Sequence, residues 1–311
     1  MAAFANTLGS PSVEGGDSAA GEHDVARAHR PLPVWRIVAW VVLAYICIQA
    51  ILIVARNPNF GWDVVGEYLF HPNILQGLTV TLGLSVVAMF LGVLFGLLVA
   101  VMRMSPDRLL SGFAAGFLWF FRGVPLLVQL IFWYNMSTLF PEFQIAVPFG
   151  GPVLAAWETN TIISPLTAAI FGLALHEAAY MAEIIRGGLL SVDRGQVEAS
   201  QAFGMSRGRA LRRIILPQAM RSIVPPTGNQ FISMVKATSL VSVIAMSDLL
   251  YSVQAIYNRN FEVISLLLVA VTWYLLIVSL LNVGQGFIER HYGRSERGPV
   301  GGKADAEEAA Q

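Results

Sequence analysis

Ionisable side chains are scarce in this sequence, and those in apolar surroundings are the first candidates for chemistry. His176-Glu177-Ala-Ala-Tyr180 begins like the helix of a zinc protease, but Tyr180 stands where the second histidine would bind metal. Gly302-Lys303 is followed by Ala304, so the phosphate-binding loop of an ATPase is incomplete. We therefore expect no metal site, no catalytic residues and no ATP hydrolysis on this chain.

The composition describes a membrane protein rather than a soluble one. Hydrophobic residues make up 55% of the 311 residues and charged residues only 13%, whereas a soluble domain carries about 25% charged residues. The mean hydropathy is +0.62. The formal net charge is zero, so we expect no electropositive surface and no nucleic acid partner. The single cysteine, Cys47, cannot form a disulfide within the chain.

Six segments are long and apolar enough to cross a bilayer as helices, for which about 20 residues are needed. They are residues 35–55, 78–102, 112–134, 162–185, 226–246 and 263–283. The predicted fold class is an all-α integral membrane protein. The fourth and fifth segments are the least apolar, and we expect their polar side chains to face protein or water rather than lipid; these are His176, Glu177, Glu183, Asn229, Gln230 and Lys236.

The loop charges predict the orientation in the cytoplasmic membrane. Nearly all Lys and Arg outside the six segments fall on one side, and the other side has only Arg56 and Arg259. Since basic loops resist translocation, both termini and the loop 186–221 are predicted to be cytoplasmic. Residues 1–34 have few apolar anchors and are predicted to be a disordered tail, and 286–311 a second cytoplasmic tail. Acidic residues before the first segment favour a retained span over a signal peptide.

The connection between the fourth and fifth segments, residues 187–225, is far longer than two helices need. We predict two short helices in it. The first begins near Asp193 and ends at Phe203, and Gly204 supplies the turn. Ser206 is predicted to cap the second helix, which Pro217 follows.

The chemistry of this loop leaves two interpretations open. Arg209, Arg212 and Arg213 lie toward the predicted end of the second helix, where the helix dipole favours cations. The pair could lie on the anionic inner leaflet as an amphipathic element. The alternative is a docking element for a cytoplasmic partner, which the residues by themselves favour less.

The same loop resembles the EAA loop of the permease subunits of ABC importers. Glu198-Ala199-Ser200 is followed after three residues by Gly204, and after nine more by Ile214-x-Leu216-Pro217, which is the spacing of that family. Only Ser200 departs from the pattern, where the family has a second alanine. The resemblance implies a coupling helix that fits a cleft on the ATP-binding subunit, formed by Glu198, Ala199, Ser200, Gly204, Ile214, Leu216 and Pro217.

Further segments are similar to the polar amino acid branch of this family, namely residues 121–129, 179–188 and 225–241. The resemblance implies an ABC importer type-1 transmembrane domain over residues 74–285, with the coupling loop at 187–225. Residues 35–55 would then be an extra N-terminal transmembrane helix.

The resemblance also implies a function and partners. The chain would be the permease subunit of an ATP-driven, binding-protein-dependent importer of a polar amino acid. It would work with an ABC ATP-binding subunit, an extracytoplasmic solute-binding protein and a second permease subunit, in a homo- or heterodimer. No cofactor is expected on this chain, because ATP and Mg would bind the ATPase subunit. The alternatives are an ion-coupled secondary transporter, for which we find no convincing repeat, and a membrane-embedded enzyme.

An amino acid carries a carboxylate and an ammonium group, so a cavity with one acidic and one basic side chain would complement both ends. Glu177 and Lys236 lie deepest in their segments and are the first candidates for the substrate path, followed by Arg122, Glu183 and Asn229. A structural salt bridge between helices is the alternative for each. Residues 225–229 are predicted to weaken the fifth span where it bends.

Two pairs of glycines are spaced for close helix packing in lipid. They are Gly92 with Gly96 and Gly112 with Gly116. We expect them to pack within the chain or against the second permease subunit.

Overall fold

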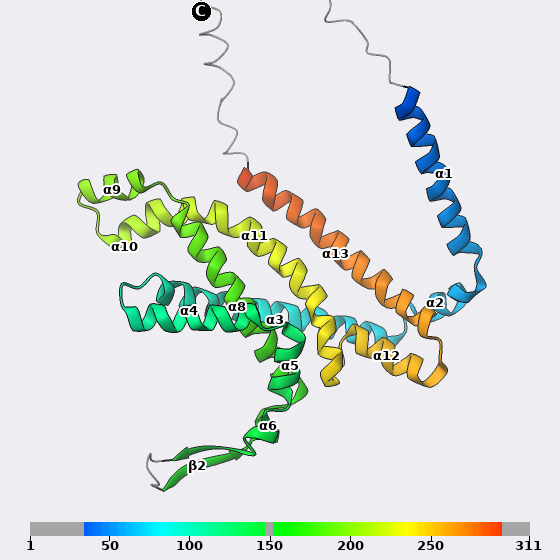
Figure 1. Ribbon diagram of the computed structural model, residues 1–311, viewed down its shortest axis with the longest axis horizontal. Coiled ribbons are helices and arrows are strands. Elements are labelled where there is room, and N and C mark those ends of the chain that lie inside the picture. The colour runs from blue at the N-terminus through cyan, green and yellow to red at the C-terminus, as the bar shows by residue number, and fades with distance from the viewer. Residues whose placement is uncertain (1–33, 147–151, 294–311) are drawn as a thin grey trace, which may run out of the picture. The chain divides into compact units, whose positions relative to one another are not determined.

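The computed structural model describes residues 34–146 and 152–293, which are mostly helical (Figure 1). The chain divides into two units, residues 1–57 and 58–311, and each is described by itself. The first contains α1 (Val34–Arg56), a 23-residue helix with a mean hydropathy of 2.7 and no buried residue. A helix that is apolar all round suits contact with lipid. The predicted tails 1–34 and 286–311 lie largely outside the described residues.

The second unit contains the remaining helices. In order they are η2 (Pro58–Phe60), α2 (Trp62–Tyr68), α3 (Pro72–Arg103), α4 (Arg108–Gly123), α5 (Leu126–Tyr134), α6 (Met136–Leu139), α7 (Thr159–Ile162), α8 (Pro165–Leu190), α9 (Arg194–Ala202), α10 (Arg207–Ala210), η3 (Leu211–Ile215), α11 (Leu216–Ala237), η4 (Thr238–Ile244), α12 (Leu249–Asn260) and α13 (Val263–Gly293).

Among the described residues, four helices are long and apolar enough to cross a membrane: α1, α3, α8 and α13. Two bent pairs raise the number to six if each pair is one span. The predicted segments therefore fall on the observed helices, although α13 continues to Gly293, well past the predicted end at residue 283.

The third predicted span is not one continuous helix. α4 and α5 meet at an angle of 102°. Val124 is extended, with a ψ of 131°, because the ring of Pro125 disfavours helical backbone in the preceding residue. The buried Gln129 amide donates to the carbonyls of Phe121 at 3.0 Å and Val124 at 2.8 Å, which satisfies the open end of α4.

The centre of the second unit is the pair α3 and α8. Gly92 and Gly96 allow the two helices to approach, since a Cβ atom at these positions would lie 2.7 Å from Glu177 Cγ and from Met181 Cβ, respectively. Neither Gly112 nor Gly116 on α4 has an atom within 4 Å of such a Cβ position. Only the first glycine pair therefore packs within the described part of the chain.

A single helical path leads from the long loop after α8 into the bundle, because α10, η3, α11 and η4 follow one another without a break from Arg207 to Ile244. The helix continues through Pro225 and Pro226, so the predicted weak point at residues 225–229 is not a break. The path bends instead by 44° before α12, where Ala245 has a φ of 57°.

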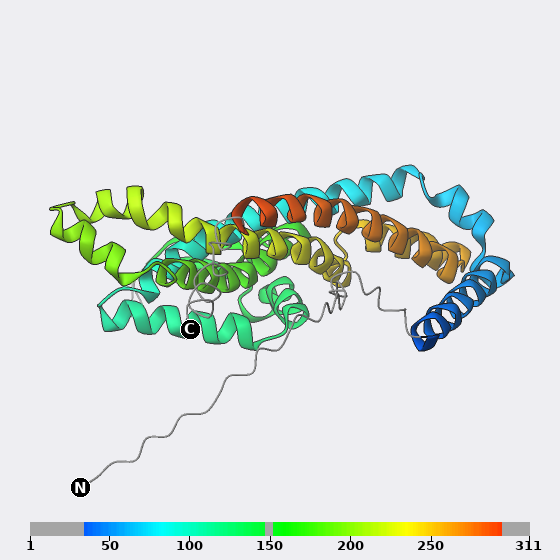
Figure 2. The same cartoon turned by 90° about the horizontal axis from the view of Figure 1, so that it is seen from above.

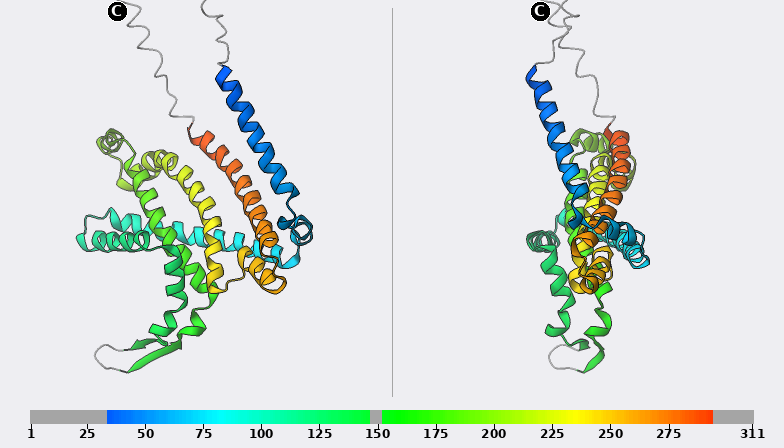
Figure 3. Two further views of the ribbon diagram at one scale, coloured as in Figure 1. Left: turned by 45° about the vertical axis from the view of Figure 1, so that its right-hand side comes forward. Right: turned by 90° about the vertical axis from the view of Figure 1, so that its right-hand side faces the viewer.

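A β hairpin that the sequence interpretation missed connects α6 to α7. β1 (Glu142–Ala146) pairs antiparallel with β2 (Val153–Glu158), with Glu142 opposite Glu158. From this hairpin α8 leads toward α9, and α11 returns beside it (Figures 1 and 3). The hairpin and the α9–α10 connection therefore lie at opposite ends of α8.

Candidate functional site

The predicted coupling loop forms a helical elbow, which we define as residues 193–217. It lies at one end of the second unit, and α12 lies at the other (Figures 1 and 2). The Asp193 carboxylate accepts a hydrogen bond from the Gln196 N–H at 3.3 Å and so begins α9. α9 ends at Phe203, and Gly204 turns the chain with a φ of 71°, a value that suits glycine. The first helix and the turn thus lie where the sequence predicts them.

The elbow carries an exposed surface. Glu198 and Ala199 are exposed, and no ion pair of Glu198 occurs among the described residues. Ser200 is 2% exposed, and its hydroxyl donates to the Val197 carbonyl at 2.7 Å. Of the other predicted contact residues, Leu216 and Pro217 are exposed and Ile214 is half-buried.

Apolar side chains also face outward on the elbow. Phe203 is 87% exposed, and Leu211 on the second arm is 46% exposed. Large apolar side chains gathered on one surface mark contacts with another molecule or with a membrane. No other element in the described part of the chain packs over this surface.

The second arm of the elbow differs from the prediction. It does not end before Pro217, because α10 continues through η3 into α11. η3 is a π-helical turn in which the Leu216 N–H donates to the Leu211 carbonyl. A proline donates no such bond and would leave a carbonyl unpaired, and a wider turn just before it accommodates this loss.

Two smaller expectations about the second arm are also wrong. Ser206 precedes α10, but its side chain makes no capping hydrogen bond. Since the helix continues beyond Arg209, Arg212 and Arg213, these side chains do not lie at a helix terminus, and the dipole argument does not apply to them.

The turn also contains a pattern that the sequence interpretation overlooked. Gly204-Met205-Ser206-Arg207-Gly208 fits the Gly-x-Ser-x-Gly motif of hydrolases. In those enzymes the serine sits on a turn from a strand to a helix. Here the turn joins α9 to α10, so the motif lacks the structural context of a nucleophile.

Glu177 occupies the centre of the α3–α8 contact. It is 4% exposed, and its Oε1 accepts a hydrogen bond from Gln230 Nε2 at 3.2 Å. The neighbouring His176 Nδ1 lies 3.4 Å from Gln129 Nε2. α8 is therefore joined to α11 by Glu177, and it approaches α5 through His176.

The predicted pair of Glu177 and Lys236 is not formed. Lys236 is exposed, and Gln230 is the residue of α11 that reaches Glu177. With about 3.6 residues per turn, positions six apart face different sides of a helix. Glu177 is thus buried between helices, whereas Lys236 lies on an exposed face of α11.

The other candidates lie nearer the elbow end of α8. Glu183 Oε2 and Arg186 Nη2 form an ion pair of 2.7 Å along one helix face. The Arg122 guanidinium lies 5.7 Å from the centre of the Tyr180 ring, a cation–π distance. These contacts join neighbouring surface groups and do not bring Arg122 or Glu183 to Glu177.

Asn229 belongs to a polar contact between α11 and α13. Its Nδ2 lies 3.5 Å from Glu289 Oε1, and Gln285 Nε2 donates to that same oxygen and to the Pro225 carbonyl, each at 2.9 Å. A Cβ atom at Gly228 would clash with Gln285 Oε1. Gln285 and Glu289 escaped the sequence interpretation because it ended the last span too early, although their spacing of four places them on one helix face.

The described residues thus form a bundle of apolar, membrane-length helices with an exposed helical elbow at one end. Residues 92–294 match the family described as binding-protein-dependent transport system inner membrane component. The chain belongs to this family.

Two curated relatives are similar over most of the chain. The arginine transport system permease protein ArgU of Corynebacterium glutamicum is 42% identical over 260 residues, which are 83% of this chain and 80% of that protein. The glutamine transport system permease protein GlnP of Escherichia coli is 32% identical over 72% of this chain and 94% of its own length.

Solved structures share the fold. A crystal structure of an amino acid ABC transporter with histidines is 32% identical, with a TM-score of 0.63, and the match covers 74% of this chain and 98% of that chain. An inward-facing form of the MetNI methionine ABC transporter has a TM-score of 0.57 at 20% identity, over 71% of this chain and 96% of that one. This second likeness concerns the fold alone.

Proposed function

We propose that this chain is the membrane-spanning subunit of an importer for a polar amino acid, powered by ATP hydrolysis on a separate subunit. The observation that carries the proposal is the exposed elbow, which presents Glu198 beside the turn at Gly204 and continues directly into the membrane helices. Membership of the binding-protein-dependent family supports it. ATP and Mg would bind the partner ATPase and not this chain.

The continuous helix from Arg207 to Ile244 supports a mechanical role for the elbow. A force applied to α9 and α10 would move α11, which contacts α8 and α13. ATP binding and hydrolysis in the partner would thereby shift the bundle between two arrangements that open to opposite sides of the membrane.

The proposed partners follow from the two ends of the molecule. The elbow, rich in arginine, would lie in the cytoplasm with both termini and contact the ATPase. An extracytoplasmic solute-binding protein would deliver the amino acid at the other end. A second permease subunit, identical or different, would complete the path.

A polar amino acid is the proposed substrate class. Relatives are named as transport system permeases for arginine, glutamine and L-cystine. Glu177 with Gln230 is the first candidate for the substrate path, because Glu177 is a buried carboxylate that is hydrogen-bonded to the helix leaving the elbow. The secondary candidates remain Arg122, Glu183, Asn229 and Lys236. Among the described residues, no hydrogen bond or ion pair joins any two of them to support a shared site.

The decisive experiment measures uptake by the importer reconstituted in proteoliposomes. The complex would hold this chain, its ATPase and its binding protein, with labelled L-arginine, L-glutamine or L-cystine outside and ATP inside. We expect uptake of at least one amino acid that stops without ATP. Glu198→Lys should abolish both this uptake and the binding of the ATPase. The control is Gln196→Lys, which adds the same charge at another exposed position of α9 and should retain both.

Two outcomes would overturn the proposal. Uptake at full rate without the ATPase would indicate an ion-coupled transporter. Full activity of Glu198→Lys would remove the elbow from coupling.

A further inference from the structure

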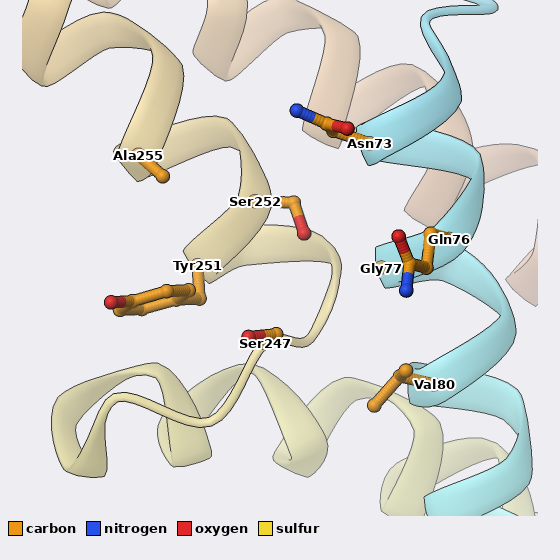
Figure 4. A pocket seen from close by; sticks show the side chains of 8 residues that line it. All are labelled: Asn73, Gln76, Gly77, Val80, Ser247, Tyr251, Ser252 and Ala255. Atoms are coloured by element: carbon orange, nitrogen blue, oxygen red, sulfur yellow. The ribbon is translucent and has the colours of Figure 1, made fainter.

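A small cavity lies between the first turns of α3 and α12, away from the elbow and from Glu177. Its volume is about 220 Å³, the share of liquid volume that about seven water molecules take. One wall comes from α3, and the other comes from α12 and from Ser247, two residues before that helix (Figure 4). The lining residues are Asn73, Gln76, Gly77, Val80, Ser247, Tyr251, Ser252 and Ala255.

The two walls are held in place by contacts below the cavity. The Leu249 N–H donates to Thr81 Oγ1 at 3.0 Å, which ties the start of α12 to α3. At Gly77 a Cβ atom would clash with Ser252 Oγ and lie 2.6 Å from the Asp248 carbonyl oxygen. The cavity is therefore preformed, and its width depends on the close approach at Gly77.

The helix ends beside the cavity offer no free amides for an anion. The Asp248 carboxylate already accepts from the N–H groups of Leu250 at 3.2 Å and Tyr251 at 2.8 Å. At α3, His71 accepts from the Asn73 N–H. Recognition in the cavity must come from the side chains.

Those side chains are neutral, polar and unpaired. Within the described part of the chain, no hydrogen bond joins the side-chain amides of Asn73 and Gln76 or the hydroxyls of Ser247, Tyr251 and Ser252 to another group. Asn73, Gln76 and Ser247 are exposed, Tyr251 is half-buried and Ser252 is 9% exposed, with a hydroxyl that is not closed off from the cavity. All five polar groups are therefore free to pair with a polar molecule that enters the cavity.

The lining selects a class of ligand. It contains no charged residue, so it cannot neutralise a single net charge. Amides and hydroxyls provide both donors and acceptors, which suits a zwitterion whose carboxylate and ammonium group cancel. The tyrosine ring, Val80 and Ala255 add a small apolar surface.

The position of the cavity suits the first step of import. In the sequence, Arg56 precedes α3, and Arg259 lies in the last turn of α12. These two are the only basic residues of the loops that the charge rule predicts to be translocated. By the same charge rule the cavity is on the extracytoplasmic side. The elbow lies at the other end of the unit (Figures 1 and 2).

We propose that this cavity is a loading site that holds the ammonium and carboxylate groups of the amino acid before it moves inward. The proposal rests on the proposed import function. Because these two groups are common to all amino acids, the loading site discriminates little between side chains, and selection falls to the binding protein and to deeper residues.

Direct binding tests the loading site. The full permease–ATPase complex in lipid nanodiscs, without binding protein, is titrated with whichever of L-arginine, L-glutamine or L-cystine the wild-type importer takes up. Gln76→Met combined with Tyr251→Phe removes two polar groups without opening space. We expect at least about a tenfold loss of affinity, the effect of losing two ordinary hydrogen bonds. Thr272→Val, which removes an exposed hydroxyl on α13, should bind as the wild type does.

Thiol labelling locates the ligand independently of affinity. In a Cys47→Ser background, the Gln76→Cys variant is labelled from outside by a membrane-impermeant maleimide. The transported amino acid should slow this labelling several-fold, and it should leave a Phe261→Cys variant unaffected, because Phe261 is 83% exposed and lies outside the cavity.

The outcomes separate this proposal from the import function. A wild-type complex that transports, whose amino acid neither protects the Gln76→Cys variant nor binds less tightly to the double variant, overturns the loading site alone. Protection by the empty binding protein but not by the amino acid also overturns it, since the cavity would then be a protein contact. A wild-type complex that transports none of the three amino acids contradicts the proposed function, and the loading site falls with it.

Discussion

The α3–α8 pair and the elbow use glycine in opposite ways. At Gly96 a Cβ atom would lie 2.7 Å from Met181 Cβ and 3.0 Å from the Ala178 carbonyl oxygen. At Gly204 nothing lies within 4 Å, and the residue is required only for its positive φ. The helix pair is completed within the chain, whereas the elbow is shaped by the chain and left open. Substitutions should therefore separate folding from transport.

The largest effect is expected in the helix pair. Gly96→Leu would force α3 and α8 apart, and overpacking of this kind costs about 1–3 kcal/mol or more. We expect little folded protein and a lower unfolding temperature, measured by fluorescence-detected size exclusion after heating in detergent.

Gly83 on the same helix is the matched control. It is exposed, and nothing lies within 4 Å of its Cβ position. Gly83→Leu should unfold at the wild-type temperature. If both variants behave alike, the close contact of α3 with α8 does not determine stability.

At the elbow the expected loss is functional. Proline fixes φ near −65°, whereas Gly204 has a φ of 71°, so Gly204→Pro must rebuild the turn. We expect ATP-driven uptake to fall at least tenfold while the variant stays in the membrane with a wild-type unfolding temperature. Gly208→Ala, on the helical arm with open space around it, should transport normally.

A result in which Gly204→Pro unfolds as Gly96→Leu does would erase the contrast between the two regions. The elbow would then be part of the folding core. Normal uptake by Gly204→Pro would instead show that the turn geometry does not matter for coupling.

A smaller, several-fold effect on uptake kinetics is expected at Glu177, the buried carboxylate that is the first candidate for the substrate path. Glu177→Gln keeps the shape of the side chain and removes its charge, so the contact with Gln230 can survive. If Glu177 meets the amino acid, the apparent KM or the preference among L-arginine, L-glutamine and L-cystine should change in uptake assays.

Glu67→Gln is the control for loss of a charge, because Glu67 is an exposed carboxylate on α2 and is not among the candidates for the substrate path. This variant should keep the wild-type kinetics. Unchanged kinetics in Glu177→Gln would remove that residue from the path and leave it a structural link between helices.

The contrast also explains what the sequence could predict. Spans were found because about 20 apolar residues are needed to cross a bilayer, and α9 was found because Asp193 and Gly204 mark its ends. Both signals are local. The bend at Val124 was missed although Pro125 lies in the middle of the apolar segment, because the length of the segment argued for one span.

Pairing between distant helices could not be derived in the same way. Glu177 and Lys236 were paired by charge and depth, but which face of α11 meets α8 is set by packing of the whole bundle. The expected effects of Pro217 and Pro225 on the helix were wrong for a related reason. Contacts between neighbouring helices can hold a helix together through a proline, and here Gln285 Nε2 of α13 donates to the Pro225 carbonyl of α11.

The smallest effect lies within the elbow, between its two predicted caps. Asp193 makes its capping bond and Ser206 does not. A working cap contributes about 1 kcal/mol, so Asp193→Ala should speed hydrogen exchange of α9 several-fold, and Ser206→Ala should leave the exchange of α10 unchanged. α10 needs no cap of its own, because its helix continues through η3 into α11 and is stabilised from that end. Faster exchange of α10 in Ser206→Ala would mean that the two arms depend equally on local caps. The second arm would then not be the rigid extension of the membrane helix that the proposed coupling requires.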